Sequence, residues 1–501
     1  MIEPRHGISR LSLFLLMALA SVFPAFSQQT CDSIPPVDPA GNFFSNFSGP
    51  CYAIPLAAGG IGDGYGGDLN AQYDIIYYKL NSRYELIFTG QHPNARYWAI
   101  SVYDLHEAGV GSISDANMQP LAAPFINPYQ PGVKFKSGQK WAATVSFGGT
   151  EPGDITPGCA VSPFNVHGNM MDATQIHSGL SWNGDPAAAS LPPHISGPNT
   201  AGAILVRRYY SLATTRPVVI VRDLTTGCAI PASEAFNTAR VVTKDRNTYV
   251  ARWRDKTQWT SHYTYADDIQ PRLCYGLDTT QQPSWLRSAE WTPGGNSETG
   301  YIAAQLPPTL IKPPPTNKFI RIRLHVPRYP NIPCTTGDCS LTGNEEMRYM
   351  SISFQNAGST LGSVKDSDFT VDANGYATLI VGIGGTKPAW ITPENGYTWI
   401  DLSGVPNYQS LSAVNIRNIR PNNTFSCRGQ VVPFRQAPWT PYGGLMADYA
   451  PVMDFPTGQS IPKQAAPFVV PAGSCSDFPP ADTLQDCTVF YPKPPALSPL
   501  Q

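Results

Sequence analysis

The sequence predicts an all-β protein made of two β-sandwich or jelly-roll-like units related by a weak internal repeat. Three observations support this prediction. Proline (50) and glycine (43) make up about a fifth of the 501 residues, against a usual total of roughly 12%, which disfavours long helices. Short β-prone runs alternate with turn signals. The motif Arg-Tyr-x-x-Ile-Ser occurs at Arg96–Ser101 and again at Arg348–Ser353, each time after a strand-like run.

The individual strands follow from alternation and from turn residues. Asn374-Gly375 precedes an apolar run at 376–382, and Asn-Gly favours hairpin turns because both residues tolerate positive φ. Helical periodicity is absent outside the N-terminal segment. The other β-prone runs lie at 74–78, 84–89, 203–206, 319–326, 351–354 and 397–402.

Four segments are expected along the chain. Residues 1–27 have the basic start, apolar run and small-residue end of a secretory signal peptide. Residues 28–305 are expected to form the first unit, with an aromatic-rich insertion at about 249–291, and residues 319–501 the second unit with an irregular Pro-rich tail. The Pro-rich residues 306–318 are interpreted as a linker, because proline lacks the backbone donor that strands and helices need. A stiff loop inside one domain is the alternative.

The signal peptide predicts a secreted or periplasmic protein with no membrane span after cleavage. Ten cysteines agree with this, because cysteines in exported chains usually form disulfides. Close spacing predicts the pairs Cys31–Cys51, Cys334–Cys339 and Cys475–Cys487, and the other four, Cys159, Cys228, Cys274 and Cys427, allow three connectivities.

The charge balance gives no strong net field. The chain has 34 Lys and Arg against 36 Asp and Glu, a formal net charge of −2. Because nucleic-acid binding depends on positive charge that neutralises phosphates, we expect no nucleic-acid partner.

Three segments resemble a bacterial family. They are residues 96–104, 369–379 and 387–397. The chain is similar there to the domain-of-unknown-function family twelve-fourteen, which is often found beside family twelve-fifty-four. The match covers part of the second half, with a weaker match in the first, and departs from the family pattern at Met350 and Phe354-Gln355. The resemblance implies a jelly-roll-like fold in exported proteins and transfers no catalytic residues.

An aromatic cluster between residues 249 and 291 is the main candidate binding region. Large rings interleaved with charged residues offer flat apolar faces with polar rims, which suit a carbohydrate-like ligand, although tryptophans that fill a sandwich core explain the same composition. The arginines of the two Arg-Tyr pairs could hold a ligand carboxylate, or stack on aromatics and bond loop carbonyls in matching places of the two units. The candidate ligand-binding residues are Arg96, Trp98, Trp253, Trp259, Tyr263, Tyr265, Trp285 and Trp291.

A secreted hydrolase or lyase acting on a polysaccharide is the alternative function. General acid–base catalysis needs paired carboxylates or a carboxylate with a histidine, and an extended chain would place Asp104 and His106 on one face. The candidate catalytic residues are Asp104, His106, Glu107, Asp267 and Asp268. A structural envelope protein without a small ligand is the third hypothesis.

No cofactor is expected. Copper at His167, Met170, Met171 and His177 would use suitable ligand types, but their spacing matches no known motif. Calcium bound to Asp63 and Asp68 would be another option, since carboxylates in loops suit that ion. Packed or solvated side chains without a metal are the favoured explanation of both groups.

Overall fold

The computed structural model describes the strand-rich parts of the chain. Within them the regular elements are strands and short 3-10 helices, η4 (Asp366–Asp368), η5 (Pro393–Asn395) and η9 (Gly458–Ser460), so the predicted all-β class is confirmed. No helix in these ranges is long and apolar enough to cross a membrane. The described residues are 54–56, 67–80, 82–104, 109–121, 123–148, 169–174, 201–212, 217–230, 285–287, 299–306, 319–335, 339–356, 359–405, 411, 413–420 and 451–467.

The first unit is a sandwich of two sheets. Its strands are β1 (Ile54–Leu56), β2 (Ala71–Lys79), β3 (Tyr84–Gln91), β4 (Ala95–Asp104), β5 (Gly109–Ser114), β6 (Lys140–Ser146), β7 (Met170–Asp172), β8 (Ala201–Ser211), β9 (Val218–Asp223) and β10 (Ala229–Ile230). The inner sheet has the order β1-β2-β8-β4-β5 and the outer sheet the order β10-β9-β3-β6-β7.

The second unit is built in the same way. Its strands are β11 (Trp285–Arg287), β12 (Thr299–Gln305), β13 (Phe319–His325), β14 (Tyr349–Asn356), β15 (Ser359–Lys365), β16 (Tyr376–Gly382), β17 (Tyr397–Asp401), β18 (Ala413–Ile419) and β19 (Val452–Asp454). The inner sheet has the order β11-β12-β18-β14-β15 and the outer sheet β17-β16-β13-β19. The second-half strands expected at 319–326, 351–354, 376–382 and 397–402 are therefore present.

The two units repeat each other strand by strand. Each strand of the second unit has the same position in its sheet as the first-unit strand whose number is lower by ten, so β14 corresponds to β4. The parallel pair β16–β17 likewise corresponds to the parallel pair β6–β7. The register shifts at the same point of each inner sheet, between Val102 and Tyr103 on β4 and between Phe354 and Gln355 on β14. The internal repeat predicted from a six-residue motif thus extends over both sheets.

The predicted boundary between the units needs a correction. Strand β12 precedes the Pro-rich residues 306–318, yet it pairs along its whole length with β18 of the second unit. The Pro-rich stretch therefore connects β12 to β13 inside one unit, which agrees with the placement in the alternative interpretation, while residues 307–318 themselves lie outside the described residues. The boundary lies between β10 and β11 instead. The prolines mark the connection between the two sheets of one sandwich and not the boundary between the units.

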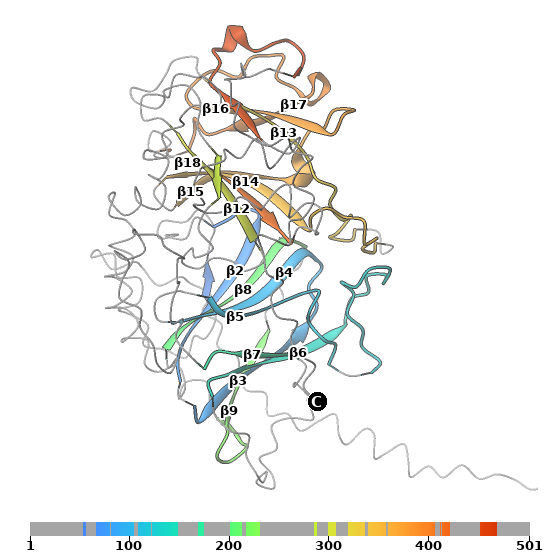
Figure 1. Cartoon of the computed structure of the whole chain (residues 1–501), viewed down its shortest axis with the longest axis vertical. Helices are drawn as coiled ribbons and strands as arrows, with labels where there is room; N and C mark the ends of the chain where they lie inside the picture. The colour runs from blue at the N-terminus through green and yellow to red at the C-terminus, as the bar shows by residue number, and fades with distance from the viewer. Residues whose placement is uncertain are drawn as a thin grey trace, which may run out of the picture.

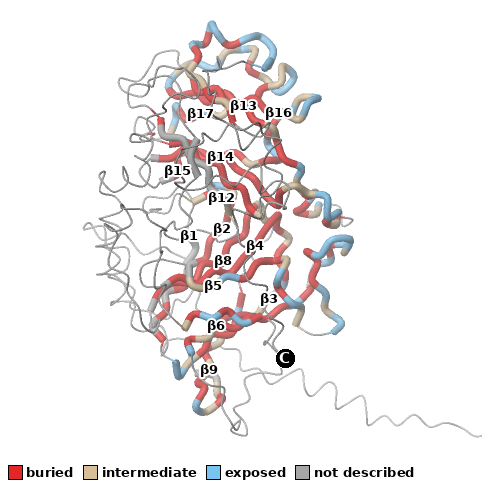
Figure 2. Tube along the Cα trace, in the orientation of Figure 1, coloured by how far each residue is buried: buried red, intermediate tan, exposed pale blue. Residues whose placement is uncertain are grey.

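The four sheets stack as layers, with the two inner sheets in the middle (Figure 1). Figure 2 shows that buried residues follow the strands of this stack and that exposed ones gather in loops. Alternation along β4 explains the packing, because successive side chains point to opposite faces. Trp98, Ile100 and Val102 enter the first unit's core, whereas Tyr97 and Tyr103 join a cluster shared with the second unit.

One predicted disulfide is confirmed. Cys334 and Cys339 are bonded, with their Cα atoms 5.6 Å apart. Cys228, in the turn between β9 and β10, is also disulfide-bonded. The predicted pairs Cys31–Cys51 and Cys475–Cys487 lie outside the described residues.

Gly202 provides a test of the inner-sheet packing. A Cβ atom at this position of β8 would lie 2.0 Å from the Tyr103 carbonyl oxygen and 2.6 Å from the Tyr78 hydroxyl. Gly202→Ala is therefore expected to lower the free energy of unfolding by about 1–3 kcal/mol or more, the usual cost of overpacking. Gly404→Ala is the control, since nothing lies within 4 Å of its Cβ position. Equal urea midpoints for the two variants would contradict the prediction.

Candidate functional site

Two of the predicted ligand-binding residues, Trp98 and Arg96, are buried inside the protein. Trp98 is 1% exposed and packs in the first unit's core, with its ring centroid 4.9 Å from that of Trp141. Arg96 is 3% exposed. Trp285 starts β11, where its backbone pairs with Ala304. The remaining candidates, Trp253, Trp259, Tyr263, Tyr265 and Trp291, lie outside the described residues.

The predicted catalytic residues are not brought together by the described part of the chain. Asp104 ends β4, opposite Gly202 of β8, and only its backbone is described. His106, Glu107, Asp267 and Asp268 lie outside the described residues. Their acid–base role stays a prediction.

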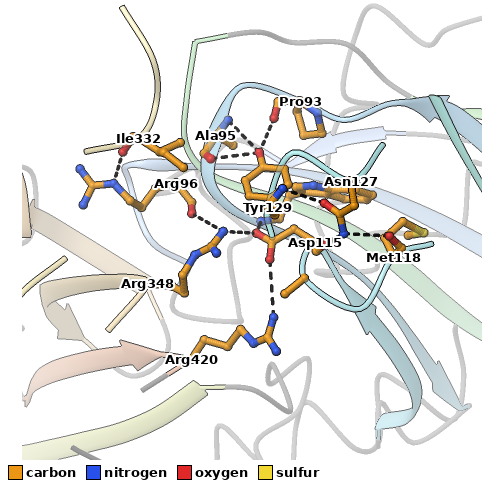
Figure 3. A network of polar contacts seen from close by, with 12 residues as sticks. Pro93, Ala95, Arg96, Asp115, Met118, Asn127, Tyr129, Ile332, Arg348 and Arg420 are labelled. Carbon is orange, nitrogen blue, oxygen red and sulfur yellow. Dashed lines mark hydrogen bonds and ion pairs between the residues drawn. The ribbon is translucent and has the colours of Figure 1, made fainter. Parts of the chain in front are cut away.

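The strongest polar arrangement is a pair of reciprocal ion pairs between the units. Arg96 of the first unit lies 3.0 Å (Nη1 to Oδ1) from Asp366 of the second. Arg348 of the second unit lies 3.0 Å (Nη2 to Oδ2) from Asp115 of the first. Both aspartate side chains are fully buried. Figure 3 shows Asp115 with its two arginine neighbours, Arg348 and Arg420.

Each aspartate also binds a backbone N–H of its own unit. Trp98 N–H donates to Asp115 Oδ2 at 3.1 Å, and Met350 N–H donates to Asp366 Oδ2 at 3.0 Å. Each donor stands two residues after the arginine of the repeated Arg-Tyr motif. The internal repeat therefore includes the two aspartates that pair with the motif arginines, as well as the motif itself. Neither aspartate was predicted from the sequence. Each comes directly after the strand that follows its motif, β5 for Asp115 and β15 for Asp366. A comparison of the two repeats extended to the ends of these strands would have found both.

The motif arginines Arg96 and Arg348 stack on aromatic rings and bond carbonyl groups, which was one of the two interpretations of the motif. Arg96 donates to the Ile332 carbonyl, and its guanidinium carbon lies 4.7 Å from the ring centroid of Tyr329. Arg348 donates to the Arg96 carbonyl at 3.3 Å and lies 5.1 Å from the ring of Tyr129. Both arginines therefore combine aromatic stacking with bonds to carbonyl groups.

Two residues with unusual backbone conformations complete these contacts. Tyr210, at the end of β8, has φ 44°, and Arg420, at the end of β18, has φ 50°. Such values are uncommon for residues other than glycine. The Tyr210 ring lies 5.3 Å from the guanidinium carbon of Arg96, and Arg420 Nη1 lies 3.8 Å from Asp115. The same backbone feature therefore serves both ion pairs.

A third buried carboxylate, Asp68, links the inner sheets. Its Oδ2 accepts hydrogen bonds from Tyr349 (2.7 Å) and Ser351, and its Oδ1 accepts from Ser363 (2.9 Å) and the Asn70 N–H (2.9 Å). Burial and the neighbouring carboxylate raise the pKa of Tyr349 well above its ordinary value, so its hydroxyl stays a donor. Protein donors thus engage both oxygens of the residue considered for calcium. Asp63 lies outside the described residues.

The candidate copper ligands do not converge in the part of the chain that is described. Met170 is 53% exposed and Met171 is 3% exposed, and adjacent residues of strand β7 point to opposite faces. His167 and His177 lie outside the described residues. Within the described ranges no three His, Cys, Asp or Glu side chains are grouped as metal ligands.

Burial dominates the electrostatics of the site. It raises the pKa of Asp366 to about 6 against the opposing effect of Arg96, and it raises the pKa of Asp115 against Arg348 and Arg420. In the adjoining core, burial lowers the pKa of His92 to about 3. Among the residues that the structure describes, neither ring nitrogen of His92 has a hydrogen-bond partner.

Comparisons with known proteins do not assign this chain to a family. No family model and no curated protein matches this sequence, so the resemblance to family twelve-fourteen stays a prediction. An uncharacterised protein of Burkholderia cenocepacia is similar in structure, with 11% identity, a TM-score of 0.43, and coverage of 90% of this chain and 99% of its own. The VPA0106 protein of Vibrio parahaemolyticus shows 9% identity and a TM-score of 0.34, covering 78% and 90% respectively.

Removing one arginine tests the buried ion pairs. Arg348→Met leaves the Asp115 carboxylate buried beside only the more distant Arg420, so we expect a loss of about 3–5 kcal/mol in the free energy of unfolding. Adding Asp115→Asn should restore part of this loss. Arg328→Met is the matched control, because Arg328 is 71% exposed in its pair with Glu346, and it should cost less than about 1 kcal/mol. Similar urea midpoints for Arg348→Met and Arg328→Met would refute the prediction.

His92 gives a pH dependence with a defined sign. Its pKa is about 3 in the folded protein and near 6.5 when unfolded, so below pH 6.5 the unfolded chain takes up a proton that folded His92 does not. This contribution therefore lowers stability as the pH falls from about 6.5 towards 3, by at most about 1.4 kcal/mol per pH unit. His92→Phe should remove it. Urea unfolding of both proteins between pH 7 and pH 4.5 measures the difference in slope, and parallel pH profiles would contradict the assignment.

Proposed function

We propose that this protein is exported and binds a neutral, carbohydrate-like ligand through the aromatic segment 249–291. The observation that carries the proposal is the composition of that segment. Its eight large rings are Tyr249, Trp253, Trp259, Tyr263, Tyr265, Tyr275, Trp285 and Trp291. Rings with polar neighbours suit the apolar faces and hydroxyl rims of sugars.

The position of β11 supports this proposal. Among the described strands, residues 285–287 form the edge strand of the second unit's inner sheet, where β11 pairs with β12. Binding residues often lie in connecting segments that a rigid scaffold positions, and β11 attaches part of the aromatic segment to such a sheet. The aromatic segment also follows the first unit's last described strand, β10, and so occupies the connection between the two units.

The burial of Trp98 and Arg96 separates them from the proposed binding surface. Trp98 contributes to the core, and Arg96 is engaged by Asp366. The remaining candidates all belong to the segment 249–291. This concentrates the proposal on one stretch of chain that mutations can test.

Affinity electrophoresis with soluble neutral polysaccharides, namely a β-glucan, an α-glucan and a galactomannan, tests the proposal. We expect at least one of them to retard the full-length protein. Trp253→Ala/Trp259→Ala should raise the dissociation constant about 30-fold or more, because a central interface tryptophan contributes about 2 kcal/mol or more.

Tyr84→Ala is the matched control, since Tyr84 is a half-buried aromatic on the first unit's outer sheet. It should leave the affinity unchanged. Absence of retardation by all three polysaccharides would contradict the proposal. Release of reducing ends would instead favour the polysaccharide hydrolase, and loss of that release in Asp267→Asn would identify the carboxylate responsible.

A further inference from the structure

A short part of the second unit lies in the core of the first. We define it as the clasp, residues 332–334 and 339–341, which the Cys334–Cys339 disulfide joins. Ile332, Cys339 and Leu341 are 1%, 7% and 4% exposed and belong to the first unit's hydrophobic core. The clasp comes from the connection between β13 and β14. Its counterpart in the first unit, between β3 and β4, spans only residues 92–94.

The two halves of the clasp bind different parts of the first unit. The Cys334 N–H donates to Asn94 Oδ1 at 2.8 Å, and Asn94 Nδ2 donates back to the Cys334 carbonyl at 2.9 Å. On the other side, the Phe135 N–H donates to the Cys339 carbonyl (2.8 Å) and the Gly132 N–H to the Leu341 carbonyl (2.7 Å). The disulfide is thus a covalent tie between two separate attachment points.

The two sulfur atoms differ in their surroundings. Cys339 is buried, whereas Cys334 is half-buried and lies next to the exposed Thr335. A thiol therefore reaches Cys334 more easily than Cys339. Reduction replaces a bond of about 2 Å by a non-bonded contact of roughly 3.5–4 Å. The close-packed core around Cys339 has to yield to this expansion.

We propose that the clasp is a redox-sensitive attachment between the two units, which loosens when a dithiol reduces Cys334–Cys339. A thiolate of the dithiol attacks Sγ of Cys334, the disulfide breaks, and Cys339 leaves as a thiolate that takes up a proton. The second thiol of the dithiol then releases Cys334. The protein gains two electrons and two protons, and the dithiol becomes a disulfide. This proposal is independent of the carbohydrate ligand.

Hydrogen exchange of the full-length protein tests the proposal. In Cys334→Ala/Cys339→Ala, the amides of residues 129–135 should exchange at least tenfold faster than in the parent, because Gly132 and Phe135 donate to the clasp. Strand β16 of the second unit should exchange at the parent's rate. Cys228→Ala removes a different disulfide and is the control, in which residues 129–135 should be unchanged.

Two results of the hydrogen-exchange experiment would overturn the proposal. Unchanged exchange at residues 129–135 would mean that packing alone holds the clasp. Equal acceleration at β16 would mean that the disulfide supports the whole fold. Redox sensitivity is measured by treating the parent with dithiothreitol under native conditions and alkylating the new thiols. Labelling of Cys334 is expected while β16 stays protected, and absence of labelling under these conditions would also overturn the proposal.

Discussion

Buried charges between the two units constrain the whole structure. Asp115 and Asp366 are withdrawn from water, and each is compensated by an arginine of the opposite unit and a backbone N–H of its own. Separating the units would leave each partner with a large desolvation cost unless water entered the interface. The relative position of the inner sheets is therefore fixed by charge pairing as well as by apolar contact.

The geometry of these pairs explains why the Arg-Tyr motif occurs twice. In each copy the arginine crosses to the opposite unit, and the next residue, Tyr97 or Tyr349, points into the cluster between the inner sheets. Alternation then sends the residue after it, Trp98 or Met350, into its own unit's core. Three consecutive residues thus reach three environments. Each of the three positions therefore requires a particular kind of side chain, which explains why a short motif is shared by two units whose sequences otherwise differ.

The fold was largely predictable from the sequence because it depends on local signals. The Asn374-Gly375 turn is one such case, since Gly375 has φ 83° and its N–H donates to the Asp372 carbonyl. The unit boundary was not predictable in this way. Proline at 306–318 shows only that the backbone donor is missing, whereas the assignment of β12 depends on its distant partner β18. The prediction of Trp98 as a ligand-binding residue was wrong for a similar reason. A tryptophan in the sequence does not show whether its ring fills a core or lies on a surface.

The differences between the repeated units are more informative about function than their similarities. Matching strands satisfy the same packing and pairing requirements, so they say little about ligands. The β13–β14 connection departs from its short counterpart and supplies the clasp, which enters the other unit's core. The aromatic segment follows β10 in the sequence and includes β11, where the second repeat begins. The first sandwich has only residues 92–94 in the place of the clasp, so a single sandwich does not require the longer connection, which packs against the other unit instead.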